Sequence, residues 1–481
     1  MSETRRVPKD KRAIIAVDLG AESCRVSLLQ WTNDSLTWRL IYRFPNAPRM
    51  VDGGLRWDLK TIESGIQHGL HECALYAPEG VRSIAVDGWA VDYVRLDQWG
   101  VAASDPYCYR DERTVAAEES LHQRISPDRI RALTGVQLMR LNTLYQLHSD
   151  AIAGVGSMYW LNLPEYILYR LGGAAVAEIT NATHCQLVDS GHLGWCTELF
   201  EAAGSDLACA PRIVPAGTIV GRLTGPISKV SQLSDTSLIA PACHDTASAI
   251  AGIPADGDDW AYISSGTWSL VGTVMDKPVN SDLAAAENFT NLAGAGGTVC
   301  FHKNINGMWI LRECLAYWEL RGMRWSLTEL LVAAERVTPP VGLIDVDDPQ
   351  LIMTGDMLGR INRQRNAKGL PSLDDSPQNA PAVVCLILHS LANRYAVVLD
   401  RVAMLTGKRL QRLFIVGGGS QNVFLSRLTE EATGLKVIRG SSESSTIGNF
   451  AVQLAALENN DTASGKVRWN DVAAWASRLQ N

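Results

Sequence analysis

The chain has 481 residues, of which 46% are hydrophobic and 20% are charged, a composition typical of globular proteins. Because single hydrophobic cores stop growing at about 250–300 residues, we expect two or three domains. The 44 Lys and Arg residues against 51 Asp and Glu residues give a net charge of −7. This balance argues against a dedicated surface for nucleic acid or an anionic membrane, since either needs a basic stripe.

The sequence shows no export, membrane or metal-cluster pattern. Residues 1–12 are charged, and no apolar run follows them as in a secretory signal. The most apolar stretch, residues 380–388, is far shorter than the roughly 20 residues that cross a bilayer. The 10 cysteines include no C-x-x-C pair, which argues against a zinc site or a disulfide framework. We therefore expect reduced thiols and a cytoplasmic location.

Strand and helix patterns alternate in the first half of the chain. Residues 13–18 form an apolar strand that leads into a turn, and residues 25–31 continue as a second strand, which predicts a hairpin. Residues 59–75 carry apolar side chains at helical spacing. A buried strand follows at residues 83–87, and residues 128–147 are mainly helical in pattern. Such alternation is typical of an α/β layered domain.

The same arrangement begins again near residue 260. A strand over residues 260–264 runs into a small-residue turn, and residues 268–274 form the next strand. A long helix is expected at residues 382–405, followed by a strand at residues 413–416 that ends at Gly417. The repeat predicts two α/β halves.

The boundary between the halves is expected near residues 252–257, whose Gly, Pro and Asp content is typical of a linker. The predicted organisation is a flexible tail, an N-terminal domain, a C-terminal domain and a C-terminal extension, at residues 1–12, 13–252, 253–460 and 461–481.

The sequence lacks both a P-loop and a G-x-G-x-x-G fingerprint, so the two commonest nucleotide-binding motifs are not supported. Three turns of small residues remain, at residues 20–23, 264–267 and 417–420, each directly after a predicted strand. Any one of them alone is most simply structural. Because three occur at matching places in two halves, we interpret them as backbone cradles for a polyphosphate.

Two aspartates are candidates for chemistry. Asp18 ends its strand and could hold Mg²⁺ directly or through water, and Arg25 could neutralise phosphate charge; a turn-forming Asp and a surface Arg are the plainer alternatives. Asp245 lies at the domain boundary, at the start of a helix-forming run, where it could take the proton of an attacking hydroxyl. An N-cap aspartate is an equally good reading there. A hydrolytic triad is disfavoured because no G-x-S-x-G motif is present.

The ordered set of these motifs resembles the FGGY carbohydrate kinases over nearly the full chain, from about residue 13 to about residue 457. The segments that carry the resemblance are residues 18–25, 86–92, 109–113, 141–147, 180–183, 244–249, 262–270, 303–307, 416–422 and 445–449.

The resemblance implies an α/β fold of duplicated actin-like (ribonuclease-H-like) domains, with ATP and sugar bound in the cleft between them. It implies that Asp245 accepts the proton of a ketose hydroxyl that attacks the ATP γ-phosphate. The expected sugar contacts are Ala90, His244, Asp245, Thr246 and Asn304, with Trp89 and Trp309 beside them as either sugar-packing or ordinary core residues. The expected nucleotide contacts are Ala21, Glu22, Ser23, Cys24, Arg25, Thr267, Arg312 and Gly418.

At four of these positions the chain has a different residue from the one usual in the family members whose motifs it resembles. Glu22 and Cys24 stand where Ser and Gly are usual in the first phosphate turn, so we expect Glu22 to point outward, since a carboxylate facing ATP would be repelled. Ala90 replaces a glycine and could alter the sugar shape that is accepted. Arg312 replaces a glutamine and could add a phosphate contact.

The expected reaction is ATP- and Mg²⁺-dependent phosphorylation of the C1 hydroxyl of L-rhamnulose in rhamnose catabolism. L-fuculose or a related pentulose or hexulose is the alternative acceptor. A non-kinase actin-like ATPase is a further alternative, although it leaves the cluster around Asp245 without a purpose. The expected partners are a small ketose and ATP, with no nucleic acid and no membrane, and the oligomeric state is left open.

Overall fold

The computed structural model describes residues 10–32, 35–458 and 467–480. The chain forms two compact units. The first comprises Met1–Asp256, Met275–Cys300 and Ser444–Asn481, and the second comprises Gly257–Val274 and Phe301–Glu443. Residues 1–9 of the predicted tail, and residues 461–466 and 481 of the predicted extension, lie outside the described residues.

The first unit is built on a six-stranded mixed sheet. The strand β1 pairs antiparallel with β2 and parallel with β6, and β12 is parallel to β6. The strands lie in the order β11 (Thr218–Arg222), β12 (Ser237–Ala240), β6 (Val81–Gly88), β1 (Ala13–Leu19), β2 (Ser23–Thr32) and β3 (Ser35–Pro45).

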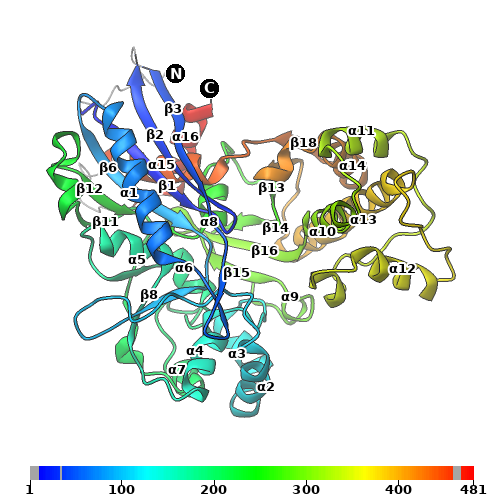
Figure 1. Cartoon of the computed structure of the whole chain (residues 1–481), viewed down its shortest axis with the longest axis horizontal. Helices are drawn as coiled ribbons and strands as arrows, with labels where there is room; N and C mark the ends of the chain where they lie inside the picture. Colours follow the sequence, from blue (N-terminus) through cyan, green and yellow to red (C-terminus); the bar gives the residue numbers. More distant parts are fainter. Residues whose placement is uncertain (1–9, 33–34, 459–466, 481) are drawn as a thin grey trace. The chain divides into compact units, whose positions relative to one another are not determined.

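Both faces of this sheet are covered, which explains why β1 is apolar at every position before Asp18. Ile15 and Val17 point into the core that includes α1 (Leu59–Leu75). Ile14 and Ala16 point into the opposite core, which includes α15 (Ser444–Glu458). Alternate residues of a strand face opposite sides of a sheet, so a continuous apolar run is the pattern of a strand buried on both sides. Figure 1 shows α1 and α15 on either side of this sheet.

The second six-stranded sheet repeats the plan. Strand β13 pairs antiparallel with β14 and parallel with β17, and β17 is parallel to β18. The strand order is β15 (Thr290–Ala293), β16 (Val299–Asn306), β14 (Trp268–Met275), β13 (Trp260–Ser265), β17 (Arg412–Val416) and β18 (Lys436–Arg439). In both sheets, a hairpin is followed by two parallel strands added beside its first strand, as a duplicated fold requires.

The remaining elements connect these strands. They are β4 (Arg49–Val51), β5 (Gly54–Arg56), β7 (Tyr93–Leu96), α2 (Thr114–Arg124), α3 (Pro127–Thr134), α4 (Thr143–Ile152), β8 (Tyr159–Asn162), α5 (Leu163–Arg170), β9 (Val176–Glu178), α6 (Ile179–His184), α7 (Thr197–Ala203), β10 (Arg212–Val214), α8 (Asp245–Ala251), α9 (Asp282–Ala286), α10 (Trp309–Leu320), α11 (Leu327–Glu335), α12 (Met357–Ala367), α13 (Ala380–Thr406), α14 (Val423–Thr433) and α16 (Trp469–Gln480), with short 3₁₀ turns between them.

The helix α13 is longer than the apolar stretch at residues 380–388 suggested. By length and composition alone it could cross a membrane, and it is the one helix of the described residues that passes this test. However, 67% of its apolar window is buried inside the protein, where it packs against α11 and α14. Burial of this kind is what a core helix shows.

The helix α15 returns to the first unit because it packs closely on α8. A Cβ atom on Gly448 of α15 would lie 1.7 Å from the carbonyl oxygen of Ser248, and one on Gly252 would lie 2.4 Å from that of Ser444. The two helices therefore meet backbone to backbone, which only glycine permits. The two compact units are therefore defined by contacts in space and combine segments that are far apart in the sequence. The domain limits at residues 13–252 and 253–460, which divide the chain in sequence order, stay a prediction.

We expect Gly448→Ala to destabilise the first unit, because the added methyl group meets the backbone of α8 rather than a movable side chain. Overpacking of this kind costs about 1–3 kcal/mol or more. The midpoint of the first thermal unfolding transition should fall. Gly156→Ala is the matched control, since a Cβ there meets nothing within 4 Å. Equal midpoints for the two variants would contradict the close helix packing.

Candidate active site

The first of the three predicted phosphate turns connects β1 to β2. Asp18 lies opposite Arg25 and Leu19 opposite Cys24 in the antiparallel register. Gly20 begins the turn, and a Cβ there would come within 2.4 Å of the Ser23 carbonyl oxygen. A side chain at position 20 would therefore clash with the turn itself, so only glycine fits there. Glycine also leaves the backbone of the turn accessible to a ligand.

The side chains of this turn divide into outward and inward groups. Glu22 is exposed, and Ala21, Ser23 and Arg25 are half-buried. Cys24 is fully buried, and burial raises the pKa of its thiol to about 12. Cys24 can therefore offer a nucleotide only its main chain.

Asp18 stands at the end of β1 with a nearly buried side chain. Its Oδ2 lies 3.2 Å from Nη1 of Arg25 and accepts a 2.6 Å hydrogen bond from the Ser445 hydroxyl. Ser445 belongs to the motif at residues 445–449, so the structure gives that motif a role. It holds the carboxylate of the first phosphate turn in a fixed orientation.

A second carboxylate, Asp87, stands beside the first. Asp87 lies one residue before the end of β6 and is the direct register partner of Asp18 in the neighbouring parallel strand. It is fully buried; its Oδ2 accepts a 2.8 Å hydrogen bond from Asn449, and its Oδ1 has no hydrogen-bond partner among the described residues. Burial raises the pKa of Asp87, and the charges of Asp18 and Asp245 raise it further.

Asp87 was not among the residues expected at the site. The signal was present, because β1 and β6 are both apolar runs that end in aspartate, and parallel neighbours present their carboxyl ends at one edge of the sheet. These two adjacent carboxylates could hold a divalent cation. Mg²⁺ is usually held by one or two carboxylates together with water and phosphate oxygens. No cluster of three or more acidic, His or Cys side chains suited to a metal occurs in the described part of the chain.

Asp245 is the first residue of α8. Its segment is placed beside β6, because the Gly88 N–H donates to the Cys243 carbonyl at 2.9 Å and Gly88 bridges to His244 in parallel. The Asp245 Oδ1 accepts a 3.2 Å hydrogen bond from the Thr246 hydroxyl and lies 3.5 Å from Nε2 of His244. The carboxylate therefore faces two of the predicted sugar contacts.

The environment of Asp245 suits a proton acceptor. Burial raises its pKa to about 7, and the charge of Asp18 acts in the same direction. Its side chain keeps 36% of its accessible surface, so a substrate hydroxyl can reach it, and solvent screening through that opening moderates the shift. A carboxylate with a pKa near 7 is suited to general base catalysis at neutral pH.

A buried glutamate fixes the segment that carries Asp245. The Oε2 of Glu178 accepts from the Cys243 N–H at 2.8 Å and from the Thr180 hydroxyl, and that hydroxyl accepts in turn from the His244 N–H at 3.1 Å. Burial raises the pKa of Glu178 to about 8, with a contribution from nearby Glu165. The motif at residues 180–183 therefore anchors the segment that carries Asp245, a role that the sequence did not reveal.

His244 is held from the other side by a second histidine. The rings of His184 and His244 lie 4.6 Å apart at an angle of 78°. Burial lowers the pKa of His184 to about 4, so its ring is neutral at physiological pH. The contact fixes the plane of the His244 ring next to Asp245.

The loop after β6 carries Ala90, the remaining predicted sugar contact of the first unit. Gly88 cannot be replaced there without a clash, since a Cβ would lie 2.6 Å from the Cβ of Leu19. Ala90 and Trp89 are both buried. Val91 has a φ of 69°, a left-handed conformation that is a genuine outlier for a β-branched residue and costs about 1–3 kcal/mol.

The second unit brings the other two small-residue turns together. Ser264 of β13 pairs with Val416 of β17 in parallel, so both turns begin at the same edge of the sheet. A Cβ on Gly417 would lie 2.8 Å from the Ser265 carbonyl oxygen, and one on Gly419 would lie 2.0 Å from the Ser265 hydroxyl. In contrast, a Cβ on Gly418 would meet nothing within 4 Å. Gly418 thus presents open backbone.

The other predicted contacts of the second unit surround the start of α10. The Thr267 carbonyl accepts from the N–H groups of Gly307 and Trp309, each at 3.2 Å. Arg312 lies one turn further along α10, is exposed, and has its guanidinium 6.0 Å from the centre of the Trp309 ring. Asn304 is half-buried in β16.

The predicted residues thus fall into two groups. Those of the first unit are Asp18, residues 21–25, Ala90 and residues 244–246; those of the second unit are Thr267, Asn304, Arg312 and Gly418.

Family comparisons place both halves in one family. The N-terminal domain of the FGGY family of carbohydrate kinases matches residues 13–252, and its C-terminal domain matches residues 261–457. The rhamnulokinase of Enterococcus faecalis is 36% identical over 455 residues, which cover 93% of this chain and 90% of that protein. The rhamnulokinase of Bacteroides thetaiotaomicron is 36% identical over 460 residues, which cover 94% and 93%.

Solved structures agree on the fold. The gluconate kinase of Lactobacillus acidophilus superposes with a TM-score of 0.76 at 16% identity, over 98% of this chain and 96% of that one. The predicted duplicated actin-like α/β fold is confirmed. With both domain matches and two full-length relatives above 30% identity, this chain belongs to the FGGY family of carbohydrate kinases.

Proposed function

We propose that the protein transfers the γ-phosphate of ATP to the C1 hydroxyl of L-rhamnulose, giving L-rhamnulose 1-phosphate and ADP. The observation that carries the proposal is Asp245, a carboxylate whose pKa is raised to about 7 and whose side chain stays reachable beside His244 and Thr246. The choice of ketose is supported by the two relatives named rhamnulokinase.

In the proposed reaction, the ketose hydroxyl oxygen forms a bond to the γ-phosphorus while the bond to the ADP oxygen breaks. The hydroxyl proton passes to the Asp245 carboxylate. Catalysis of this kind depends mainly on positioning and on stabilising charge at the phosphoryl group. The hydrogen bonds that the main-chain N–H groups of Cys243 and His244 donate to Glu178 and Thr180 hold Asp245 in place before substrate arrives.

Sugar contacts are assigned to Ala90, His244, Thr246 and Asn304. The ring of His244 is fixed by His184, and the Thr246 hydroxyl already donates to Asp245. Because these groups are preorganised, little conformational entropy is lost when the sugar binds.

Nucleotide contacts are assigned to residues 21–25, Thr267, Arg312 and Gly418. All but Arg312 lie in or beside the small-residue turns, which offer backbone N–H groups to phosphate oxygens. Asp18 and Asp87 fit a magnesium ion, because both are oxygen donors and the Oδ1 of Asp87 lacks a partner among the described residues. When bound, Mg²⁺ would neutralise phosphate charge. Glu22 belongs to the first of these turns, and its side chain is exposed to solvent. The assignment of both groups to one ketose and one ATP is part of this proposal.

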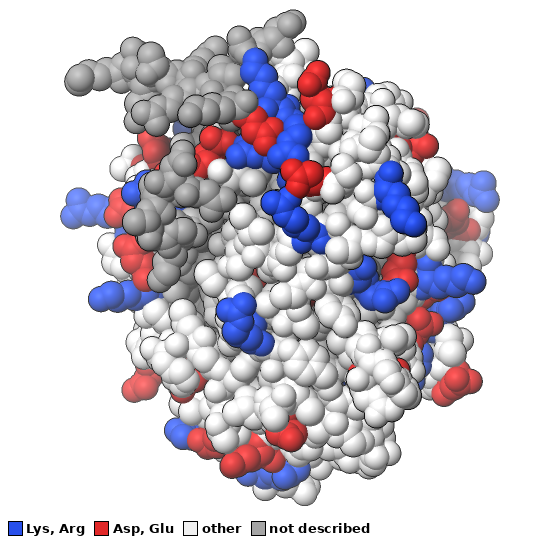
Figure 2. Space-filling model, turned by 90° about the vertical axis from the view of Figure 1, so that its left-hand side faces the viewer, with Lys and Arg blue, Asp and Glu red and all other residues white. Residues whose placement is uncertain are grey.

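A cytoplasmic enzyme is supported by the state of the cysteines. All ten are free thiols and nine of them are buried, as expected in a reducing compartment. On the face drawn in Figure 2, basic and acidic side chains are interspersed.

The test is ADP release by the full chain with ATP, Mg²⁺ and a panel of ketoses that includes L-rhamnulose, L-fuculose and L-ribulose. We expect the highest kcat/KM with L-rhamnulose. Asp245→Asn should fold as the wild type does but lose about 10²–10⁴-fold in sugar-dependent turnover, because the amide cannot accept the proton.

A higher kcat/KM with another ketose would support the kinase activity but assign a different sugar as the substrate. The methyl group of Ala90, which narrows the sugar site relative to glycine, would account for that preference. ATP turnover that is indifferent to every sugar would indicate the actin-like ATPase instead. Near-normal turnover by Asp245→Asn would remove this residue from the role of base.

The open backbone at Gly418 gives a separate test of the nucleotide site. We expect Gly418→Ala to leave the thermal midpoint unchanged, because the methyl group meets no protein atom, and to raise the KM for ATP several-fold, because the methyl group occupies the place of the phosphate. Gly156→Ala, equally open but distant from every phosphate turn in the sequence, should change neither. An unaltered KM for ATP in Gly418→Ala would contradict the assignment.

A further inference from the structure

The loop that carries Ala90 is held in an unfavourable conformation. Val91 directly follows Ala90, and its φ of 69° is one that glycine adopts freely and a β-branched residue avoids. Such strain persists only where the surroundings enforce it, and it concentrates at functional sites. The inference that follows rests on the proposed function, in which the backbone at Ala90 touches the sugar.

One helix, α4, holds the chain on the C-terminal side of Ala90. The Val91 carbonyl accepts a 2.8 Å hydrogen bond from the Thr143 hydroxyl and a 3.2 Å bond from the Gln146 amide, one turn further along α4. Two residues on, the Tyr93 hydroxyl donates to Asp150 at the end of the same helix, at 2.5 Å. Three side chains of α4 therefore fix this short segment.

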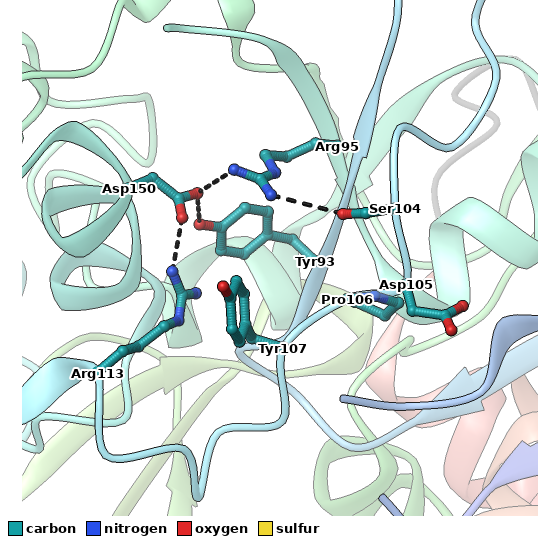
Figure 3. Close-up of a pocket in the computed structure, with 8 residues that line it drawn as sticks. All are labelled: Tyr93, Arg95, Ser104, Asp105, Pro106, Tyr107, Arg113 and Asp150. Carbon is teal, nitrogen blue, oxygen red and sulfur yellow. Dashed lines mark hydrogen bonds and ion pairs between the residues drawn. The ribbon is translucent and has the colours of Figure 1, made fainter. Parts of the chain in front are cut away.

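The last of these anchors is itself reinforced. Asp150 Oδ1 lies 2.6 Å from Nη1 of Arg113, and its Oδ2 lies 3.4 Å from Nη1 of Arg95. Figure 3 shows the three side chains converging on this carboxylate, with Tyr107 alongside. Because two guanidinium groups hold Asp150 in place, the position of Tyr93 is fixed.

Between these anchors lies Asp92, which is fully buried and gathers donors from four parts of the unit. Its Oδ2 accepts from the indole N–H groups of Trp57 at 2.6 Å and Trp89 at 2.9 Å, and from the Tyr109 N–H at 3.2 Å. Its Oδ1 accepts from the Gln146 amide at 3.1 Å. A buried carboxylate is stabilised by such a set of donors, and each donor is fixed in return.

Two of those donors flank the sugar loop. The rings of Trp57 and Trp89 lie 4.4 Å apart, and Trp89 immediately precedes Ala90. The carboxylate thus fixes the residue before Ala90 through an indole, and the residue after it through the amide of Gln146, which also holds the Val91 carbonyl.

We propose that Asp92 is the positioning residue for sugar recognition: it locks the Trp89 to Val91 segment in its strained conformation, so that the Ala90 backbone is presented to the ketose. Asp92 touches neither substrate nor nucleotide. It acts on the affinity for the sugar rather than on the phosphoryl group.

The test is Asp92→Asn in the full chain, assayed with whichever ketose the wild type turns over with the highest kcat/KM. The asparagine amide places an N–H donor opposite groups that are themselves donors. We therefore expect the Trp89 to Val91 segment to leave its strained conformation. We expect the KM for the ketose to rise about tenfold or more, with kcat within about threefold of the wild type and the KM for ATP unchanged.

A second substitution separates positioning from simple destabilisation. Glycine adopts a positive φ without strain, so Val91→Gly in the Asp92→Asn background should restore much of the affinity for the ketose. The matched control is Asp347→Asn, which removes a charge that pairs with Arg394 at 2.6 Å in the second unit and should leave the KM for the ketose unchanged.

An Asp92→Asn enzyme with a wild-type KM for the ketose would overturn the proposal, and so would losses spread equally over kcat and both KM values without rescue by Val91→Gly. Should Asp92→Asn fail to fold, Trp57→Phe removes one donor and keeps the ring. A KM for the ketose unchanged in that variant would overturn the proposal as well. Because the assay uses the preferred ketose, failure of L-rhamnulose as substrate leaves this test intact.

Discussion

The structure depends on the convergence of three carboxylates, Asp18, Asp87 and Asp245, in a largely buried place. Like charges repel and burial penalises ionisation, so such a group is costly unless it is tied down. Ser445 and Asn449 of α15 each donate to one of the strand-end carboxylates. The helix α15 therefore stabilises the acidic centre, and the close glycine contact between α8 and α15 lets it reach that centre.

Buried, hydrogen-bonded side chains hold the few residues that are proposed to take part in the reaction. The strand ends supply Asp18 and Asp87, a seven-residue helix supplies Asp245, and buried side chains such as Glu178 and Asp92 fix the loops between them. None of these buried groups needs to touch a substrate. They hold the geometry before binding, which is where an enzyme of phosphoryl transfer gains most of its rate.

Much of this could be predicted from the sequence, because local patterns carry it. The apolar runs, the repeated hairpin and the small-residue turns predicted two α/β halves, three phosphate turns and the candidates Asp18 and Asp245. The actin-like fold and the sugar contacts were implied by the resemblance to the FGGY carbohydrate kinases. Asp87 could be found in the sequence only once β1 and β6 are assumed to be parallel neighbours, and the role of Glu178 and the strain at Val91 could not be predicted in this way. They depend on which strand lies beside which, on burial that opposes ionisation, and on hydrogen bonds between residues far apart in the chain.

The central claim is that Asp245 accepts the proton, and the dependence of kcat/KM on pH tests it most directly. A carboxylate with its pKa raised to about 7 is an active base only above that pH. For the wild type, we predict that kcat/KM for the preferred ketose is level above pH 8 and falls about tenfold per pH unit well below pH 7. The residual activity of Asp245→Asn should lack this break. A level wild-type profile from pH 5.5 to 8, or the same break in Asp245→Asn, would contradict the account.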